Sequence, residues 1–182
     1  MRNDPRAASL YTLHVDALHA YVARRVGRDL AADVVAEAFR IAIEDLDHYD
    51  TARGSQQAWL FGIATNLLRR HWRTEARRLA AMSRYGTTRV PDGDPLLRID
   101  EQTDANADLG RVLAAMAELD VEDRDLLVLI AWEGCSYRDA AYALGIPLGT
   151  IRSRLHRIRR TLRTAIRQST PTAISERFFD DE

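Results

Sequence analysis

The sequence has no lysine, a single cysteine and few aromatic residues. All 26 basic residues are arginine, and aromatic residues make up 7% of the chain. Because Cys135 stands alone, an intramolecular disulfide and every multi-cysteine zinc site are excluded. No apolar run is long enough to cross a bilayer and the N-terminus shows no signal-peptide pattern, so we expect a cytoplasmic protein. No segment has the alternating pattern of a strand, which leaves an all-α chain.

The net charge of −1 argues against a nonspecific, histone-like DNA binder but hides a segregated pattern. Residues 1–83 carry 12 arginines and 10 acids, and residues 109–168 carry 10 and 7. Between them, residues 84–108 carry 3 and 6, and residues 169–182 carry 1 and 4. We therefore predict two small helical domains, 8–83 and 109–168, joined by a flexible acidic linker and followed by a disordered acidic tail.

Apolar residues at three- and four-residue spacing predict three helices in the first domain. They cover about residues 8–26, 30–46 and 56–81. Gly27 would end the first helix, and Asp29 would cap the second. The third helix is apolar in its first half and rich in arginine in its second half.

Residues 136–163 are the most informative stretch, and they predict two helices joined by a tight turn. Ser136 and Asp139 have the spacing of a capping box at the first helix, with Asp in place of the usual Glu or Gln. Gly145 and Pro147 would end that helix and form the turn. A short helix, a turn and a longer second helix are typical of a DNA-binding helix-turn-helix.

The second of these helices has one apolar stripe and one cationic face. Between residues 150 and 168 there are seven arginines and no acid. An ordinary amphipathic surface helix would mix glutamate with its arginines, so we favour DNA recognition. The apolar stripe is formed by Ile151, Leu155, Ile158, Leu162 and Ile166.

Three motifs together resemble one family. LAADVVAEAF at 30–39, AWLFGIATNLLRRHWR at 58–73 and the helix-turn-helix at 136–163 are similar to bacterial RNA polymerase sigma factors of the extracytoplasmic-function (ECF) class. The two domains would be sigma regions 2 and 4. The resemblance implies a dissociable subunit of RNA polymerase that recognises promoters and helps to open them, without enzymatic activity or a cofactor of its own.

The resemblance also implies the binding residues. Asp33 and Glu37, one turn apart on the second helix, would dock on the clamp helices of the polymerase β′ subunit; the alternative is a solvated acidic face. Region 4 would also grip the β flap, and an anti-sigma factor is a further candidate partner. The residues matching the −10 element positions are Asn66, Arg69, Arg70 and Arg73. The residues matching the −35 element positions are Arg152, Ser153, His156 and Arg157, and Arg160 would bind DNA phosphate or remain solvated.

For the melted −10 strand, the resemblance pairs Asn66 with the preceding loop, residues 49–57, as the site of a flipped-out base. Aromatic rings that could hold single-stranded bases are Trp59, Phe61 and Trp72. Trp59 and Phe61 cannot both be stacking platforms, and the spacing favours Trp59 as core.

The sequence departs from the family at three positions, where Ala32, Ala36 and Thr65 replace the usual acid, glutamine and arginine. Ala32 and Ala36 change which polar contacts can be made to the polymerase, and Thr65 removes one phosphate contact.

Two other classes of function remain as alternatives. A stand-alone helix-turn-helix regulator would explain residues 109–168 but would leave the first domain without a role. An enzyme would need a catalytic or metal-binding cluster. Glu44 and His48 have helical metal-ligand spacing, yet no third ligand is near them in the sequence.

Overall fold

The computed structural model describes residues 4–83 and 114–167, and every regular element within them is helical. The all-α prediction is confirmed. None of these helices is both long and apolar enough to cross a membrane. The predicted linker and the acidic tail lie outside the described residues.

The N-terminal module has three long helices and one short 3-10 turn. Its elements are α1 (Pro5–Val26), α2 (Arg28–Glu44), η1 (Leu46–His48) and α3 (Gln56–Ser83). Asp4 caps α1, accepting a hydrogen bond from the Arg6 amide at 2.9 Å, and Pro5 fills the first helical position. The expected Asp29 cap of α2 is wrong: Gly27 is the N-cap, at φ 81°, and Asp29 lies in the first turn.

The core of this module is packed around the first half of α3. Tyr21 and Phe61 are fully buried, with ring centroids 4.8 Å apart, and the Tyr21 hydroxyl lies 2.6 Å from Thr65 Oγ1. Phe61 is therefore not free to stack on a base. Trp59 packs at the edge of the core with its ring 5.1 Å from Tyr49, so it is only partly the core residue that the spacing predicted.

The C-terminal module consists of shorter helices. After a helical segment at residues 114–117, its elements are α5 (Val121–Ala131), α6 (Tyr137–Leu144) and α7 (Leu148–Arg167). Ser136 caps α6 by accepting from the Asp139 amide at 3.0 Å. Gly145 ends α6 in the left-handed conformation, φ 65°, which favours glycine. The predicted helix-turn-helix is confirmed.

The apolar stripe of α7 packs inward as its spacing predicts. Ile151, Leu155 and Ile158 are buried against Leu126 of α5 and Ala140 of α6. Leu162 is half-buried at the edge of this cluster, and the side chain of Ile166 is outside the described residues. Burial of the stripe turns the arginine side of α7 outward.

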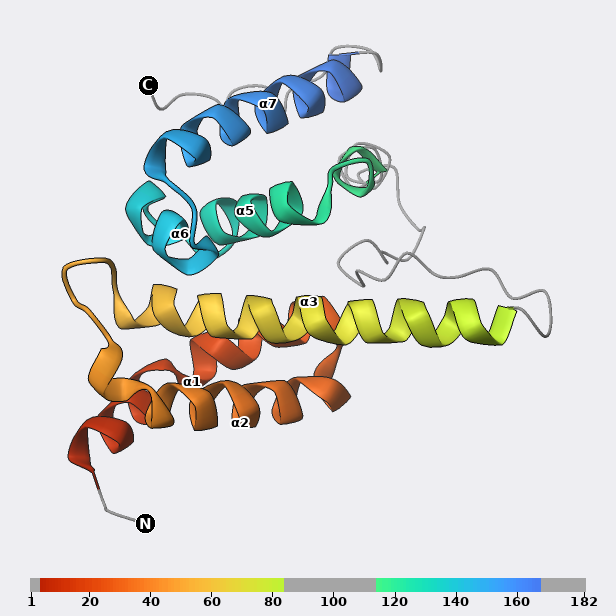
Figure 1. Ribbon diagram of the computed structural model, residues 1–182. Coiled ribbons are helices and arrows are strands. Elements are labelled where there is room, and N and C mark those ends of the chain that lie inside the picture. Colours follow the sequence, from red (N-terminus) through yellow and green to blue (C-terminus); the bar gives the residue numbers. More distant parts are fainter. Residues whose placement is uncertain (1–3, 84–113, 168–182) are drawn as a thin grey trace.

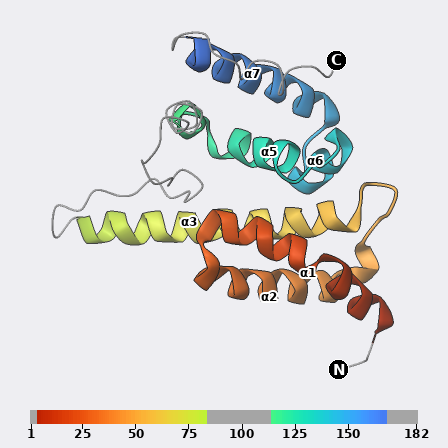
Figure 2. The same ribbon diagram turned by 180° about the vertical axis from the view of Figure 1, so that it is seen from behind.

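Helix α3 lies between the other two long helices of its own module and the C-terminal module (Figures 1 and 2). Helices α1 and α2 pack on one side of it, and α6 packs on the other. Val128, Leu129 and Ala143 of the C-terminal module join the same apolar cluster as the N-terminal core. The two modules are thus in direct contact, which the sequence did not predict.

Candidate nucleic-acid and polymerase interfaces

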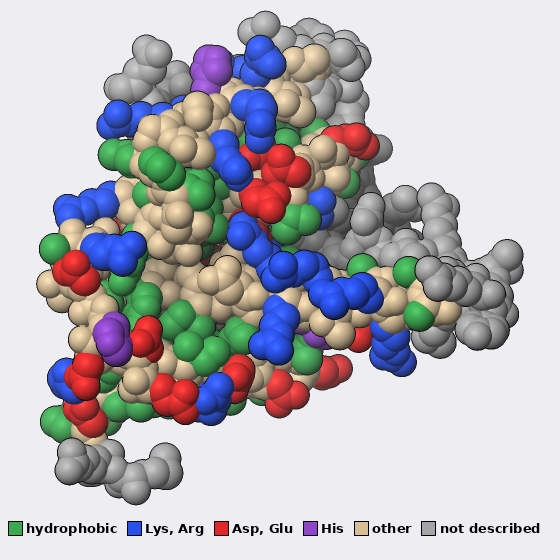
Figure 3. Space-filling model, in the orientation of Figure 1, with side chains coloured by type: hydrophobic (Ala, Val, Ile, Leu, Met, Phe, Trp, Pro, Cys, Tyr) green, Lys and Arg blue, Asp and Glu red, His purple; other side chains and the backbone are tan. Residues whose placement is uncertain are grey.

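The cationic face of α7 points away from the rest of the molecule. Arg152, Ser153, His156 and Arg160 are all exposed. Figure 3 shows basic side chains and one histidine gathered over this helix. The Ser153 hydroxyl donates to the Thr150 carbonyl at 3.1 Å and keeps its lone pairs for another donor. The face has the donors and acceptors that major-groove recognition needs.

Arg157 is the exception on this face. Its Nη2 lies 2.5 Å from Asp123 Oδ2 and 3.4 Å from Asp120 Oδ2, both at the start of α5. The hydrogen bond to Asp123 raises the pKa of the guanidinium above its usual value. Although its side chain is 53% exposed, Arg157 is held by its own module. It would have to exchange these partners to reach a base.

The second half of α3 carries the other arginine row. At 100° per residue, Asn66, Arg69, Arg70 and Arg73 fall within an arc of about 100°. Asn66, Arg70 and Arg73 are exposed, and basic side chains gather over this part of the helix in Figure 3. An exposed amide beside a row of guanidinium groups suits a single strand with accessible bases.

Arg69 is covered by the C-terminal module. Its Nε lies 2.5 Å from Oδ2 of Asp125, and only 23% of its side chain is exposed. The other carboxylate oxygen of Asp125 pairs with Arg25 of α1, and both of these side chains are completely buried. One acid of α5 thus bridges two arginines of the N-terminal module.

Trp72 is also engaged rather than free. The Arg25 guanidinium carbon lies 4.8 Å from the centroid of its ring, and Trp72 packs against the N-terminal core. This is the distance of a cation–π contact. Of the three rings expected to hold bases, Phe61 is buried and Trp59 and Trp72 are partly buried.

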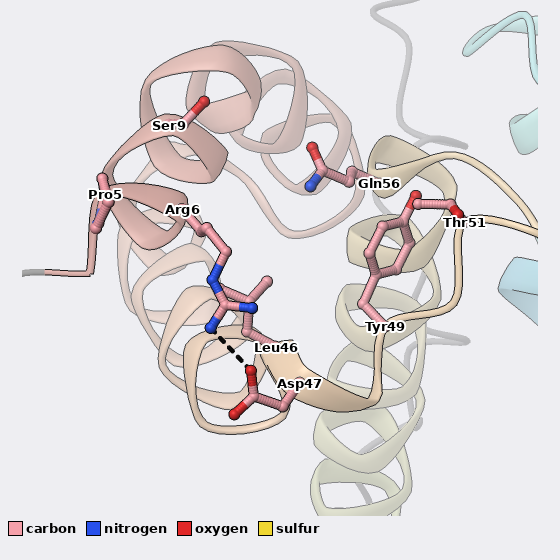
Figure 4. Close-up of a pocket in the computed structure, with 8 residues that line it drawn as sticks. All are labelled: Pro5, Arg6, Ser9, Leu46, Asp47, Tyr49, Thr51 and Gln56. Atoms are coloured by element: carbon pink, nitrogen blue, oxygen red, sulfur yellow. Dashed lines mark hydrogen bonds and ion pairs between the residues drawn. The ribbon is translucent and has the colours of Figure 1, made fainter.

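The loop before α3 borders a cavity of about 510 Å³. Figure 4 shows its lining, with Arg6 of α1 paired to Asp47 at 2.8 Å. The lining residues are Pro5, Arg6, Ser9, Leu46, Asp47, Tyr49, Thr51 and Gln56. Asn66 is not among them and lies about 15 Å further along α3 than Gln56. The pairing of Asn66 with residues 49–57 at one flipped-out base stays a prediction.

Helix α2, which carries the acidic pair, lies on the opposite side of α3 from α7 (Figure 1). Asp33 is exposed, and Glu37 pairs with Arg40 at 2.7 Å. This partner holds the pKa of Glu37 below its usual value. Arg40 also pairs with Glu44 at 2.6 Å, so two acids share one arginine. The face keeps a net negative charge, and Figure 3 shows acidic side chains along this edge.

The polar pairs that raised the question of metal binding or catalysis have other partners. Glu44 binds Arg40, and His48 Nδ1 lies 2.8 Å from Asp45. Among the described residues, no three side chains of the metal-ligating types come together. Cys135 is half-buried against the apolar clusters of both modules, and burial raises its thiol pKa to about 12, so it is a packing residue rather than a reactive thiol.

Three residues have roles in the contact between modules that were not predicted from the sequence. Gly62 of α3 lies against the α6 backbone, Asp125 bridges the two arginines, and Asp139 accepts from the Ser55 amide at 2.8 Å. Of the three, only Asp125 could have been identified from the sequence. It shares a helical face with Val128 and Leu129, and an acid on an apolar face needs a partner.

Comparisons with known proteins follow the same division of the chain. Residues 10–78 match the family model described as Sigma-70 region 2, and residues 109–162 match Sigma-70, region 4. The chain is 36% identical over 132 residues to the ECF RNA polymerase sigma factor SigC of Mycobacterium tuberculosis, covering 72% of this chain and 68% of that one. It is 31% identical to SigL of the same species, over 88% of each chain.

The structure resembles solved sigma factor complexes. It matches the sigma factor RpoE bound to the anti-sigma factor NepR from Bartonella quintana, with a TM-score of 0.61 and 25% identity, over 90% of this chain and 98% of that one. A stand-alone helix-turn-helix regulator is not favoured, because it leaves the region 2 match unexplained. The chain belongs to the ECF class of the sigma-70 family of RNA polymerase sigma factors.

Proposed function

We propose that this sigma factor docks on core RNA polymerase through Asp33 and Glu37 and reads promoters through α3 and α7. The observation that carries this is the separation of three charged surfaces on one chain. Helix α2, with its exposed acids, lies on one side of α3, and α7, with its exposed arginines, lies on the other (Figure 1). The polymerase and the −35 duplex can then be bound at the same time.

On α7, we assign base recognition to the residues at the start of the helix. An arginine can bind guanine through two hydrogen bonds, and a serine hydroxyl can either donate or accept. Arg152 and Ser153 are exposed in the first two turns, where a recognition helix meets base edges. His156 and Arg157 would extend this reading, and Arg160 would bind phosphate.

On α3, we assign capture of the melted −10 strand to Asn66 with phosphate contacts from Arg69, Arg70 and Arg73. An amide can both donate to and accept from a base edge, and guanidinium groups neutralise phosphates along a strand. The cavity beside Tyr49 and Gln56 would accept a different nucleotide from the one that meets Asn66, because the two lie far apart along the helix.

The proposal assigns no catalysed reaction to the chain, because the polymerase makes the RNA. It places the protein in the cytoplasm, where promoter DNA and polymerase are. It also includes control by an anti-sigma factor, supported by the likeness to RpoE in complex with NepR.

Reconstitution with core polymerase tests the function. The full chain should co-purify with core enzyme and direct transcription from a subset of genomic DNA sites. Asp33→Arg with Glu37→Arg should weaken core binding by on the order of 100-fold, since two close charge pairs are reversed. A control with the same charge change, Asp16→Arg with Glu118→Arg, alters exposed acids elsewhere and should bind normally. Equal binding by both doubles would refute the docking surface.

A further inference from the structure

Asp123 is a buried acid at the start of α5, and only 3% of its side chain is exposed. Its Oδ2 accepts two hydrogen bonds from Arg157, one from Nε at 3.0 Å and one from Nη2 at 2.5 Å. Asp120, whose side chain caps α5, adds a longer contact of 3.4 Å to the same Nη2. The guanidinium group of Arg157 is therefore bound toward α5, within its own module.

The other oxygen of Asp123 has a second arginine near it. Among the described residues, no group donates a hydrogen bond to Oδ1. Arg154 Nη1 lies 3.7 Å from this oxygen, which is close enough for an ion pair but too long for a hydrogen bond. Arg154 and Arg157 are three residues apart on α7, so both can reach one carboxylate from the same face.

This arrangement lets Asp123 exchange one arginine for the other. A buried carboxylate that loses its only close partner is strongly destabilising, so Arg157 needs a replacement when it leaves. A shift of about 1 Å would bring Arg154 within hydrogen-bond distance of Oδ1. Arg154 is 28% exposed and is not among the residues that match the −35 positions, so it is available for this role.

The two kinds of DNA contact open to Arg157 differ in strength. A phosphate of nonspecific DNA offers a contact in solvent that salt weakens. A guanine in the major groove offers two hydrogen bonds to one guanidinium group. A buried carboxylate that already accepts two hydrogen bonds competes well with the phosphate and less well with the guanine. Arg157 should therefore stay on Asp123 along nonspecific DNA.

We propose that Asp123 holds Arg157 away from DNA phosphates and releases it to a guanine of the −35 element, as Arg154 takes its place on the carboxylate. Asp123 and Arg154 are positioning residues that act through Arg157. The result is weaker binding to nonspecific DNA and one more contact at the promoter. The inference rests on the proposed function, because it requires Arg157 to read a base.

Asp123→Asn in the full-length protein removes the charge that holds Arg157 and should free it to bind phosphate. On a fluorescein-labelled duplex of mixed sequence, the slope of log affinity against log salt should steepen by about 0.9, the value of one phosphate contact. Adding Arg157→Ala to this variant should restore the wild-type slope. The matched control is Glu122→Gln, which removes one charge from an exposed neighbour and should leave the slope unchanged. An unchanged slope in folded Asp123→Asn would overturn the inference.

Arg154→Gln tests the exchange without altering Asp123. Its affinity for a −35 duplex, taken from a promoter mapped by the reconstitution above, should fall about tenfold, within the range that one guanine contact contributes. Its affinity for the mixed-sequence duplex should not change, because Arg157 stays on Asp123 there. In the Asp123→Asn background, Arg154→Gln should have no effect on either duplex. A loss on both duplexes, or one that persists in that background, would overturn the exchange.

The wild-type protein separates failure of the inference from failure of the proposed function. Equal wild-type affinity for the −35 and mixed-sequence duplexes would refute the proposed reading of the −35 element, and the inference with it. A wild type that prefers the −35 duplex, with an Arg154→Gln variant that keeps the full preference, would refute the inference alone.

Discussion

Helices α3 and α7 both carry a row of arginines opposite an apolar stripe, yet their surroundings differ. Helix α7 packs on one side only, and its arginines face outward except where acids at the start of α5 hold them, as Asp123 holds Arg157. Helix α3 is packed on two sides, and Arg69 in its row is bound by an acid of the other module. Two cationic faces that look the same on a helical wheel can therefore differ in what holds them: an acid of the same module on α7, and an acid of the other module on α3.

The largest expected effect comes from the buried side of α3. Phe61→Ala should cost about 3–5 kcal/mol of unfolding free energy, because the ring is fully buried against Tyr21. Leu162→Ala, at the half-buried end of α7, should cost clearly less. Chemical denaturation followed by circular dichroism measures both. Equal losses would contradict the contrast in packing between the two helices.

Substitutions on α7 should have a smaller effect, on DNA affinity, and should distinguish base recognition from phosphate binding. Arg152→Ala should cost about 1–3 kcal/mol of promoter affinity and relax preference at one base pair of the −35 element. Arg160→Ala should weaken binding evenly across sequences and flatten its salt dependence. Anisotropy titrations on a set of single-base-pair promoter variants distinguish the two. Equal, sequence-independent losses would show that Arg152 does not read bases.

Acidification should weaken the contact at the start of α3. Burial raises the pKa of Asp139, but hydrogen bonds from the Ser55 amide and Ser136 outweigh it and leave the pKa below its usual 3.8. A lowered pKa stabilises the contact above about pH 3.8 and loses that effect as the pH falls through the folded-state value. The Ser55 amide resonance should therefore be constant from pH 7 to 5 and shift only near or below pH 4. In Asp139→Asn this shift should disappear.

The smallest effect on stability is expected at Asn66. Because its side chain is exposed, Asn66→Ala should change the unfolding free energy by no more than about 0.5 kcal/mol. Duplex −35 binding should also be unchanged, whereas promoter opening, followed by permanganate reactivity, should fall. A large drop in melting temperature with normal strand capture would make Asn66 a structural residue.

The positions and ends of the helices were well predicted because the residues that determine them are neighbours in the sequence. Three- and four-residue spacing located α1, α2, α3 and α7 to within a few residues, and Ser136 and Gly145 marked the ends of α6. Which ring of α3 is innermost was harder to predict. Phe61 and Trp59 lie two positions apart on the helix, and the spacing favoured Trp59, but Tyr21 and Thr65 surround Phe61 instead.

The contact between modules could not be predicted because its partners lie far apart in the sequence. Thr65 appeared as a lost phosphate contact, whereas it is a buried hydrogen-bond partner of Tyr21. Asp125 follows Glu122, Asp123 and Arg124 in the sequence, so its charge alone does not set it apart. Its partners, Arg25 and Arg69, become apparent only when α5 is placed against α3.

The sequence separation across the α3–α6 contact has a consequence for synthesis of the protein. Gly62 and Ala143 are 81 positions apart, so α6 leaves the ribosome after α2 and α3 are already outside. At about 5–20 residues per second, that delay is roughly 4–16 seconds. During this interval the nascent N-terminal module can fold on its own short-range contacts with nothing covering Arg69. A newly made chain therefore exposes Arg69 first and covers it only after α5 and α6 have been made.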